Sequence, residues 1–574
     1  MRSTQGSPVS APPGIPPDSS ASAARAAALE RLQGDCGRQL DLLVIGGGAT
    51  GLGVALEAAQ RGLQVALLEG GDFAQGTSSR ATKLVHGGVR YLAQGNVALV
   101  REALHERAGI LARAPQVAQP LGFVVPAYRW WERPWYAAGL FAYAALAGRR
   151  GLGPTRALSR QATLAALPGV RGPGLRGGVQ YWDGQFDDAR LAVLLARSAA
   201  AQGACVLNHV GVEGLRHAGD RVCGVRARDA LTGAPLELRA RCVVNATGVW
   251  VDAVRAMRGT AQPPLVSPSQ GVHLVVDRAF LPGSQALLVP RTADGRVLFA
   301  VPWLGKTLLG TTDTPRSDCA TEPEPFEDEV EFILREAGRV LARAPGRADV
   351  RSAWVGLRPL VRPPERPSAG LSGPSAGGGL AAGADPAPTR SLSREHTVLI
   401  EADGLLTVTG GKWTTYRAMA QDVLRQAAQA ALLPAEVGEP APQVADRLVG
   451  AAPGRPLTEP PGEHLYGSEA AALHALPGAR RWLARDEESG QGVLSEAMVR
   501  FAARAEMACS VEDVLARRSR LLFLDAAQAG RIADEVARVL AEELGPGFDA
   551  PASAAALRAL AARYAAVGRT DPSA

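Results

Sequence analysis

A run of glycines near the N-terminus has the residue types and the spacing needed to hold the diphosphate of a dinucleotide. Gly46, Gly48 and Gly51 lie between an apolar segment typical of a buried strand and one typical of a helix. Glycines there allow a tight turn and a close approach to a pyrophosphate, and the helix N-terminus adds positive potential. Glu69 ends the second strand, where a carboxylate can accept hydrogen bonds from ribose hydroxyls. Residues 39–69 therefore predict a dinucleotide-binding βαβ unit.

Two other segments have compositions that suit a flat, polar cofactor. Residues 76–92 are rich in glycine and small hydroxyl side chains, and residues 409–417 connect an apolar strand to a helix. Only three of the 62 basic residues are lysines, and two of these, Lys83 and Lys412, fall in the two segments. An ammonium beside a helix N-terminus can stabilise negative charge on a reduced flavin ring. These features favour a flavin.

The elements that would position these motifs change in character along the chain. Helices over 96–112 and 191–202, a strand over 205–209 and a β-meander over 211–241 continue the nucleotide-binding unit. Residues 264–312 predict strands without intervening helices, and residues 440–565 show helical periodicity and no strand-like alternation. The predicted fold class is α/β plus α, with a Rossmann-like FAD-binding domain, a mixed or antiparallel substrate sheet and a C-terminal helical domain.

The expected domains follow from these elements. Residues 1–38 are expected to be a disordered tail rich in Pro, Ser, Gly and Ala, with a short helix over 23–33. The other expected units are a discontinuous FAD-binding domain (39–115, 180–262 and 391–431), a substrate domain (116–179 and 263–390, with a flexible insert at 366–389) and the C-terminal helical domain (432–574).

The composition excludes several classes of protein. Hydrophobic residues make up 47% of the 574-residue chain and charged residues 21%, which excludes global disorder. The six cysteines are scattered without a CxxC pair or a Cys/His cluster, so we expect neither a disulfide framework nor a metal site. A net charge of +6 without a nucleic-acid motif predicts no nucleic-acid partner. No apolar run approaches the roughly 18–20 residues of a membrane-spanning helix.

Eight motifs, in order along residues 39–430, resemble the FAD-dependent glycerol-3-phosphate dehydrogenases, within the D-amino-acid-oxidase-like flavoproteins. They are DLLVIGGGATGLG, TSSRATKLVHGGVRYL, DDARL, VVNATGVWVD, LGTTDT, VGLRPLV, SREHTV and TGGKWTTYR. The helical tail, with ARRSRLLFLD, resembles the C-terminal domain of that family. The chain departs from the family in its N-terminal tail, in the 366–389 insert and in lacking a calcium-binding EF-hand loop.

The resemblance implies FAD as the cofactor and a specific reaction. A hydride passes from the carbinol carbon of sn-glycerol 3-phosphate to the flavin, the product is dihydroxyacetone phosphate, and the electrons pass to a membrane quinone. The cofactor-binding residues that it implies are Gly46, Gly48, Gly51, Glu69, Thr77, Ser78, Ser79, Lys83, Leu84, His86, Gly248, Gly411, Lys412 and Thr414.

The same reaction needs cations for the phosphate and a base for the hydroxyl proton. Arginine binds phosphate bidentately, and histidine is the usual general base. His273 lies in a predicted strand, where a histidine can also be structural, and His86 could instead position the flavin or the substrate. The expected catalytic residues are His273, His86, Arg358 and Lys412, and the expected substrate-binding residues are Arg90, Tyr91, Arg358 and Arg394.

Residues 128–150 are rich in aromatic side chains and have arginine at both ends. Two interpretations stay open, an interfacial element docked on anionic lipid or a helix packed in the core of the substrate domain. The resemblance favours the first. We therefore expect a protein bound peripherally to the cytoplasmic face of a bacterial inner membrane, or else a cytoplasmic one. Its expected partners are glycerol 3-phosphate, a quinone and the membrane surface, and a homodimer is compatible with these.

Two alternative functions stay open at this point. Oxygen-dependent glycerol-3-phosphate oxidases share these motifs, and reactivity with oxygen depends on access to the flavin, which the sequence does not give. The non-enzymatic alternative is a flavin-binding scaffold or sensor without catalysis. The presence of Arg90, Arg358 and Lys412 together argues against a site that has lost its chemistry.

Overall fold

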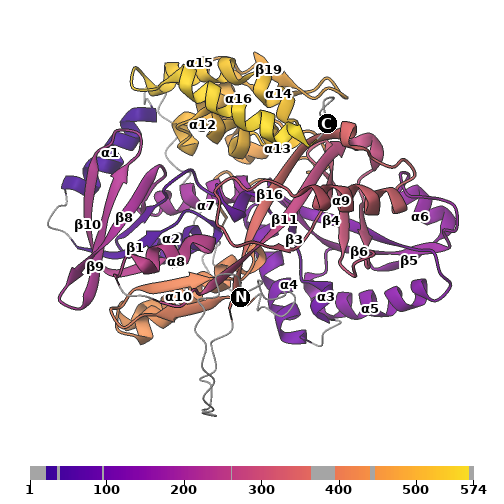
Figure 1. Cartoon of the computed structure of the whole chain (residues 1–574), viewed down its shortest axis with the longest axis horizontal. Coiled ribbons are helices and arrows are strands. Elements are labelled where there is room, and N and C mark those ends of the chain that lie inside the picture. The colour runs from indigo at the N-terminus through magenta and orange to yellow at the C-terminus, as the bar shows by residue number, and fades with distance from the viewer. Residues whose placement is uncertain are drawn as a thin grey trace, which may run out of the picture.

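Two large sheets and a helical cap make up the chain (Figure 1). One sheet has eight strands and the other has ten, and the C-terminal helices lie across the top of both in this view. The computed structural model describes residues 21–34, 39–92, 96–259, 262–362, 395–439 and 447–567. The predicted insert at 366–389 lies outside these residues.

The eight-stranded sheet contains the predicted βαβ unit. Its parallel part runs in the order β18-β10-β1-β2-β7, and β8, β9 and β17 extend it with antiparallel pairs. Helices cover its faces, which explains why its central strands are almost continuously apolar. Its strands are β1 (Leu40–Ile45), β2 (Val65–Leu68), β7 (Cys205–Leu207), β8 (Val210–Ala218), β9 (Arg221–Asp229), β10 (Pro235–Asn245), β17 (Thr397–Ile400) and β18 (Leu406–Thr409).

Three helices from distant parts of the chain pack against this sheet. They are α2 (Ala49–Gln60), α7 (Asp188–Ala201) and α10 (Tyr416–Gln429), and their apolar side chains share one buried cluster. The N-terminal helix α1 (Ala21–Gly34) also contacts this part, because Arg25 pairs with the buried carboxylate of Asp229. The expected helix over 23–33 is therefore present, and the segment expected as a disordered tail contains it.

The ten-stranded sheet is mixed, as the sequence predicted. Most neighbours are antiparallel, and β4 and β12 pair in parallel. Strand β6 crosses the boundary expected between residues 179 and 180. The strands are β3 (Leu84–Val85), β4 (Ala118–Ala127), β5 (Arg156–Ser159), β6 (Gly177–Phe186), β11 (Val266–Asp277), β12 (Ala286–Val289), β13 (Leu298–Trp303), β14 (Lys306–Gly310), β15 (Thr314–Pro315) and β16 (Val350–Val361).

Helices α3 (Val89–Leu92), α4 (Val97–Arg113) and α5 (Glu132–Ala147) lie along the lower edge of the second sheet in Figure 1, away from the C-terminal cap. The Asn96 side chain caps α4 by accepting a hydrogen bond from the backbone N–H of Leu99. Helices α6 (Arg160–Ala166) and α9 (Glu327–Val340) pack elsewhere on the same sheet.

The C-terminal region is mainly helical, with one exception to the prediction. Its helices are α11 (Ala470–His474), α12 (Glu496–Glu506), a π-helix (Asp513–Arg518), α13 (Leu521–Leu524), α14 (Ala526–Arg531), α15 (Ala533–Leu544) and α16 (Ala550–Ala566). The expectation that this region has no strands was wrong, because β19 (Trp482–Arg485) and β20 (Gly492–Ser495) form an antiparallel hairpin. Each strand has only four residues, too short for alternation to be recognised.

Buried ion pairs fasten the C-terminal region to the first sheet. Asp72, which follows β2, accepts from both Arg517 and Arg518 of the π-helix. Arg190 of α7 pairs with Glu506 of α12 at 2.6 Å, with both side chains almost fully buried. Removing one partner of such a pair leaves an uncompensated buried charge, so the C-terminal region is held in one position.

Candidate active site

The glycine turn has the shape that a pyrophosphate site requires. A Cβ on Gly51 would overlap the carbonyl oxygen of Gly46, so a side chain there would push α2 away from the β1 turn. A Cβ on Gly48 would meet only the hydroxyl of Ser78, at 3.2 Å, among the described residues. The space over Gly48, at the start of α2, is therefore left to a ligand.

Residues predicted to bind the cofactor surround this turn. Ser78 accepts a hydrogen bond from the Ala49 N–H at 3.0 Å, which ties the 77–79 segment to the start of α2. Glu69 accepts hydrogen bonds from the backbone N–H groups of Gly47 (2.6 Å) and Gly71 (2.8 Å). Its carboxylate is thereby fixed at the end of β2, where a ribose would lie. The open cradle and the fixed acid fit the ADP half of FAD.

A cavity of about 830 Å³ lies against the ten-stranded sheet and is lined by eight of the 19 predicted site residues. Its wall includes side chains from the 77–86 segment, β11, β16 and the 411–414 turn, which are far apart in sequence. The predicted residues that line it are Thr77, Leu84, His86, His273, Arg358, Gly411, Lys412 and Thr414.

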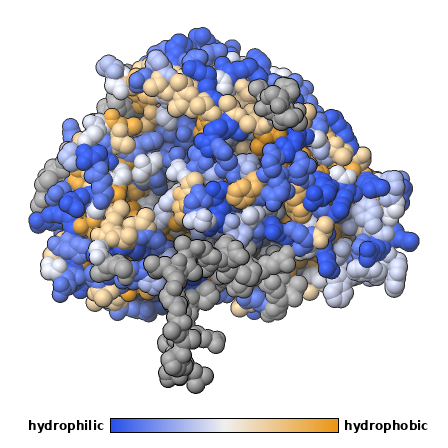
Figure 2. Space-filling model, viewed as in Figure 1, coloured by the Kyte–Doolittle hydropathy of each residue, from blue (hydrophilic) through white to orange (hydrophobic). Residues whose placement is uncertain are grey.

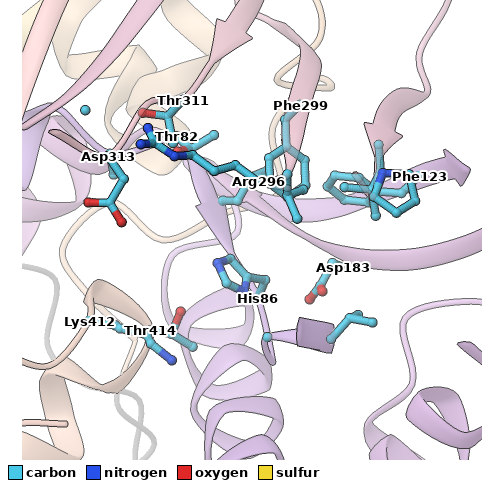
Figure 3. A pocket seen from close by; sticks show the side chains of 18 of the residues that line it. Thr82, His86, Phe123, Asp183, Arg296, Phe299, Thr311, Asp313, Lys412 and Thr414 are labelled. Carbon is cyan, nitrogen blue, oxygen red and sulfur yellow. The ribbon is translucent and has the colours of Figure 1, made fainter. Parts of the chain in front are cut away.

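The two ends of this cavity differ in chemistry (Figure 3). Lys412, Thr414 and Asp313 lie on one side of His86 in this view, and the rings of Phe123 and Phe299 lie on the other. We call these the polar end and the apolar end. The apolar end continues along α5, which contributes residues from Trp135 to Ala142 to the wall.

His273 is buried at the cavity wall, with a defined orientation. Its Nε2 is 3.0 Å from the Thr82 hydroxyl, and its ring stacks on Trp354 with centroids 4.2 Å apart. A Cβ on Gly310 would lie 2.5 Å from the imidazole Cδ2, so only glycine leaves room for this ring. Burial, with Lys83 and Arg358 nearby, holds the pKa of His273 well below its usual range. The imidazole is neutral at physiological pH and can accept a proton.

Arg358, on β16, lines the polar end and is already held by its surroundings. Its guanidinium donates to the carbonyl oxygens of Gln270 (3.1 Å) and Thr312 (3.0 Å). The Asp313 carboxylate is 3.4 Å from Nη1. A Cβ on Gly271 would overlap the guanidinium, so this glycine provides its space. Arg358 is therefore a fixed cation at the wall.

The turn that carries Lys412 depends on two glycines. Gly410 and Gly411 have φ of +78° and +71°, a backbone conformation that favours glycine. The indole N–H of Trp413 donates to the Ser78 carbonyl at 2.8 Å, which joins this turn to the serine segment. Lys412, Trp413 and Thr414 thereby enter the polar end of the cavity.

Several predicted residues lie elsewhere. Lys83 and Ser79 are buried behind the cavity and do not line it. Gly248, at φ +64°, accepts from the Thr409 hydroxyl at 3.1 Å and lies near the end of β18. Arg394 is outside the described residues. Arg90 and Tyr91 belong to α3, and their side chains are not among the described ones.

The cavity also contains side chains that the sequence did not single out. Thr82, Thr311 and Asp313 lie inside two motifs, TSSRATKLVHGGVRYL and LGTTDT, and close attention to hydroxyl and acidic positions there could have found them. Arg296 precedes β13 in no recognisable motif. Asp183, on β6, pairs with Arg107 at 2.9 Å across 76 residues, a contact that no local signal predicts.

Comparisons with known proteins agree with this geometry. Residues 41–417 match the family described as FAD dependent oxidoreductase, and residues 405–547 match the C-terminal domain of alpha-glycerophosphate oxidase. The mitochondrial glycerol-3-phosphate dehydrogenase of Homo sapiens is 38% identical over 538 residues, covering 88% of this chain and 71% of that protein. The mitochondrial enzyme of Arabidopsis thaliana is 39% identical over 548 residues, covering 88% and 83%.

Solved structures give the same result. The glycerol-3-phosphate dehydrogenase from Bacillus halodurans, complexed with FAD, superposes with a TM-score of 0.72 at 29% identity, covering 95% of this chain and 98% of that one. The L-alpha-glycerophosphate oxidase from Mycoplasma pneumoniae shares the fold, with a TM-score of 0.51 at 16% identity over 68% of this chain and 94% of that one. With the relatives above, these matches confirm the fold class and the cofactor that the sequence predicted. The chain belongs to the FAD-dependent glycerol-3-phosphate dehydrogenase family.

Proposed function

We propose that this protein oxidises sn-glycerol 3-phosphate to dihydroxyacetone phosphate and passes the electrons to a quinone. The observation that carries the proposal is the cavity, which brings His273, Arg358 and Lys412 together beside the nucleotide cradle in a chain of this family. FAD, when bound, supplies the hydride acceptor. The other requirements fall to side chains of the protein.

His273 is suited to take the hydroxyl proton as the carbinol carbon loses its hydride. Its imidazole is neutral because its pKa is low, and Nε2 already contacts the Thr82 hydroxyl. Nδ1 is buried and has no hydrogen-bond partner among the described residues, so the tautomer that donates from Nε2 to Thr82 keeps a lone pair on Nδ1 for a proton. Arg358 supplies the cation at the polar end for the phosphate, and Lys412, at the same end, would place positive charge beside a bound flavin.

The apolar end of the cavity supports a quinone as the electron acceptor. It is lined by aromatic and aliphatic side chains, among them Phe123, Leu288 and Phe299, which suit a flat apolar ring. Trp135 of α5 lines the cavity and is also 72% exposed. A quinone dissolved in lipid could therefore enter beside α5 if this helix lay on a membrane.

The surface around α5 supports peripheral membrane docking. Trp130 is 77% exposed and Phe141 is 49% exposed, while only Leu140, Tyr143 and Ala147 of the helix are buried. The surface facing the viewer in Figure 2 is a mosaic of polar and apolar residues. Exposed aromatic side chains flanked by Arg129, Arg149 and Arg150 fit an interfacial element on anionic lipid.

Among the described residues, no helix combines the length and the apolar character needed to cross a bilayer. The cytoplasmic face of a bacterial inner membrane stays our prediction for its location, and the enzymes of Homo sapiens and Arabidopsis thaliana named above are mitochondrial. A homodimer also stays a prediction.

The proposed reaction is tested by the visible spectrum of the purified protein. Anaerobic glycerol 3-phosphate is expected to bleach the flavin band, and a water-soluble quinone analogue is expected to restore it. Glycerol, which lacks the phosphate, should bleach it poorly. Without a flavin band the protein would be a scaffold of another kind, and a stable band in the presence of glycerol 3-phosphate would exclude this substrate. Hydrogen peroxide formed in air in proportion to substrate would make it an oxidase.

Membrane docking is tested by sedimentation with vesicles of phosphatidylglycerol and phosphatidylcholine. The wild-type protein should sediment with the vesicles, be released by detergent and be released only in part by high salt, because apolar burial and charge attraction both contribute. The double variant Trp130→Ser with Trp135→Ser should bind about tenfold more weakly, since partial burial of large apolar side chains is worth about 1–2 kcal/mol.

The matched control for this experiment is Leu231→Ser. Leu231 is 47% exposed, in the turn between β9 and β10 and far along the chain from α5. Its loss should leave vesicle binding unchanged. Equal binding by the Trp variant and the wild type would exclude α5 as the docking surface.

A further inference from the structure

A buried lysine behind the polar end takes no part in the function proposed above. Lys83 is fully buried, and its ammonium donates to both carboxylate oxygens of Asp188 at 2.8 and 2.9 Å and to the Ser79 carbonyl at 2.7 Å. Burial lowers the pKa of Lys83 to about 7, and Asp188 acts in the opposite direction. Such a pair is costly to bury, and a hydrophobic replacement is often as stable. Stability alone is therefore a weak reason for its presence.

Aromatic rings connect this ammonium to His273. The Lys83 Nζ lies 4.5 Å from the centroid of the Trp354 ring and 5.1 Å from that of Trp303. Trp354 is in turn stacked on His273, with ring planes 20° apart. A shift of Lys83 would thus be transmitted to the face of the imidazole through a single indole.

A second connection runs through the backbone. Thr82, whose hydroxyl contacts His273 Nε2, directly precedes Lys83 in the chain. Lys83 itself has a φ of +64°, a conformation that a side chain other than glycine adopts only when its surroundings hold it. The ion pair with Asp188 provides that hold. Lys83 therefore fixes both the ring that stacks on the imidazole and the hydroxyl that contacts it.

The C-terminal region completes this arrangement. Arg520, which precedes α13, donates to the Ser79 carbonyl at 2.7 Å and to Asp188 Oδ1 at 3.2 Å. Phe523 of α13 contacts the Trp354 ring with centroids 5.2 Å apart. Among the described residues, none that follows Thr414 in the chain lines the cavity. Any influence of the C-terminal region on the reaction must therefore be indirect.

We propose that Lys83, clamped by Asp188 and Arg520, is a positioning residue that orients His273 through Trp354 and Thr82. The C-terminal region then acts on the reaction by holding this clamp. The inference rests on the proposed role of His273 as the proton acceptor. The sequence analysis had suggested that Lys83 binds the cofactor. We instead propose that it positions the catalytic base, His273.

The test uses the holoenzyme of Lys83→Met, which keeps the length of the side chain and leaves Arg520 to compensate Asp188. We expect normal flavin content and a substrate Kd within about threefold of wild type. The rate of anaerobic flavin bleaching should fall about five- to tenfold, because a misoriented base lowers the rate of the chemical step more than binding.

A pH measurement separates this role from a merely structural one. Lys83 and Arg358 are the cations that lower the pKa of His273. The charges of Asp188 and Arg520, which lie next to Lys83, are opposite in sign and form an ion pair. Removing the Lys83 charge should therefore raise the pKa of His273 and move the acid limb of kcat/KM to higher pH. NMR of the protein labelled at histidine Cε1, which contains only eight histidines, measures the same titration directly.

The matched control is Lys306→Met. Lys306, on β14, is also buried and pairs with a carboxylate, that of Asp277, at 2.9 Å, but it does not line the cavity and does not contact the C-terminal clamp. Asp277 keeps Arg351 as a partner, as Asp188 keeps Arg520, so this variant should leave the bleaching rate and the His273 titration unchanged. If Lys83→Met does not fold, Phe523→Leu provides the second variant, and it should slow bleaching without a change in flavin content.

Two results would overturn the proposal. One is that Lys83→Met bleaches at the wild-type rate and that its His273 titrates as in the wild-type protein. The other is an equal loss of rate in Lys83→Met and Lys306→Met. If the wild-type protein itself is not bleached by glycerol 3-phosphate, the proposed reaction fails, and the NMR titration still decides whether Lys83 acts on His273.

Discussion

Gly48→Val is expected to give a folded protein that retains less than about a tenth of its flavin, because a side chain there occupies the space that the pyrophosphate needs. The backbone at Gly48 is extended, with φ −81° and ψ −179°, so valine adopts it without strain. The only described atom near the added Cβ is the Ser78 hydroxyl, at 3.2 Å. The substitution therefore obstructs the ligand and leaves the fold in place. The ratio of absorbance at 450 nm to that at 280 nm after purification measures the loss.

The control for this prediction is Gly109→Val in α4. An added Cβ at Gly109 meets nothing within 4 Å, so any loss there reports only the lower helix propensity of valine. Both variants should show cooperative thermal unfolding, and only Gly48→Val should lack flavin. A Gly48→Val protein with full flavin content would mean that the cofactor does not lie over this turn.

The parts of the fold that the sequence predicted are those held by short-range contacts. Gly46 and Gly51 are five positions apart, and the close approach between them follows from a spacing visible in the sequence. The strands of the second sheet between residues 264 and 312 were also predicted, because each alternates or is continuously apolar within its own length. Contacts of this kind need no knowledge of distant residues.

Lys83 shows why residues of the site could not all be assigned. Its position in a glycine- and serine-rich segment suggested a cofactor contact, but its partner Asp188 is 105 residues further along the chain. Whether an ammonium faces a ligand or a buried carboxylate is decided by tertiary packing, which no local pattern records. The same reason applies to Arg296 and Asp183, which enter the cavity from outside the recognised motifs.

The aromatic segment before and within α5 could not be resolved from its composition. Tryptophan and alanine suit both a core helix and an interfacial one. The sequence does not show which face of the helix is covered by another element. In the structure the rings of Trp130 and Trp135 are left exposed while Tyr143 is covered. Burial therefore favours the interfacial interpretation that the sequence had left open.

Arg358→Ala is expected to lower kcat/KM for glycerol 3-phosphate about ten- to a hundredfold, because a lost charge-assisted contact to a phosphate costs about 1.5–3 kcal/mol. A buried phosphate dianion must be paired, and Arg358 is a cation fixed at the polar end of the cavity by two carbonyl oxygens. The contact with Asp313 is long, at 3.4 Å, so a phosphate can compete for the same guanidinium. Flavin content should stay normal, and the variant should lose most of the preference for glycerol 3-phosphate over glycerol.

Arg351→Ala is the matched control, because Arg351 lies on the same strand, β16, but pairs with Asp277 away from the cavity. Its kinetics should resemble wild type within about twofold, as expected for a partly exposed ion pair. An unchanged kcat/KM in Arg358→Ala would mean that the phosphate binds elsewhere. Arg296 would then be the next cavity-lining arginine to replace, since its ion pair with Asp294 is partly exposed, whereas Arg80 is buried, pairs with Glu322 and donates to the Val355 carbonyl. If kcat/KM falls only in Arg358→Ala, and this variant also loses the preference for glycerol 3-phosphate over glycerol, the substrate phosphate binds at the polar end beside His273.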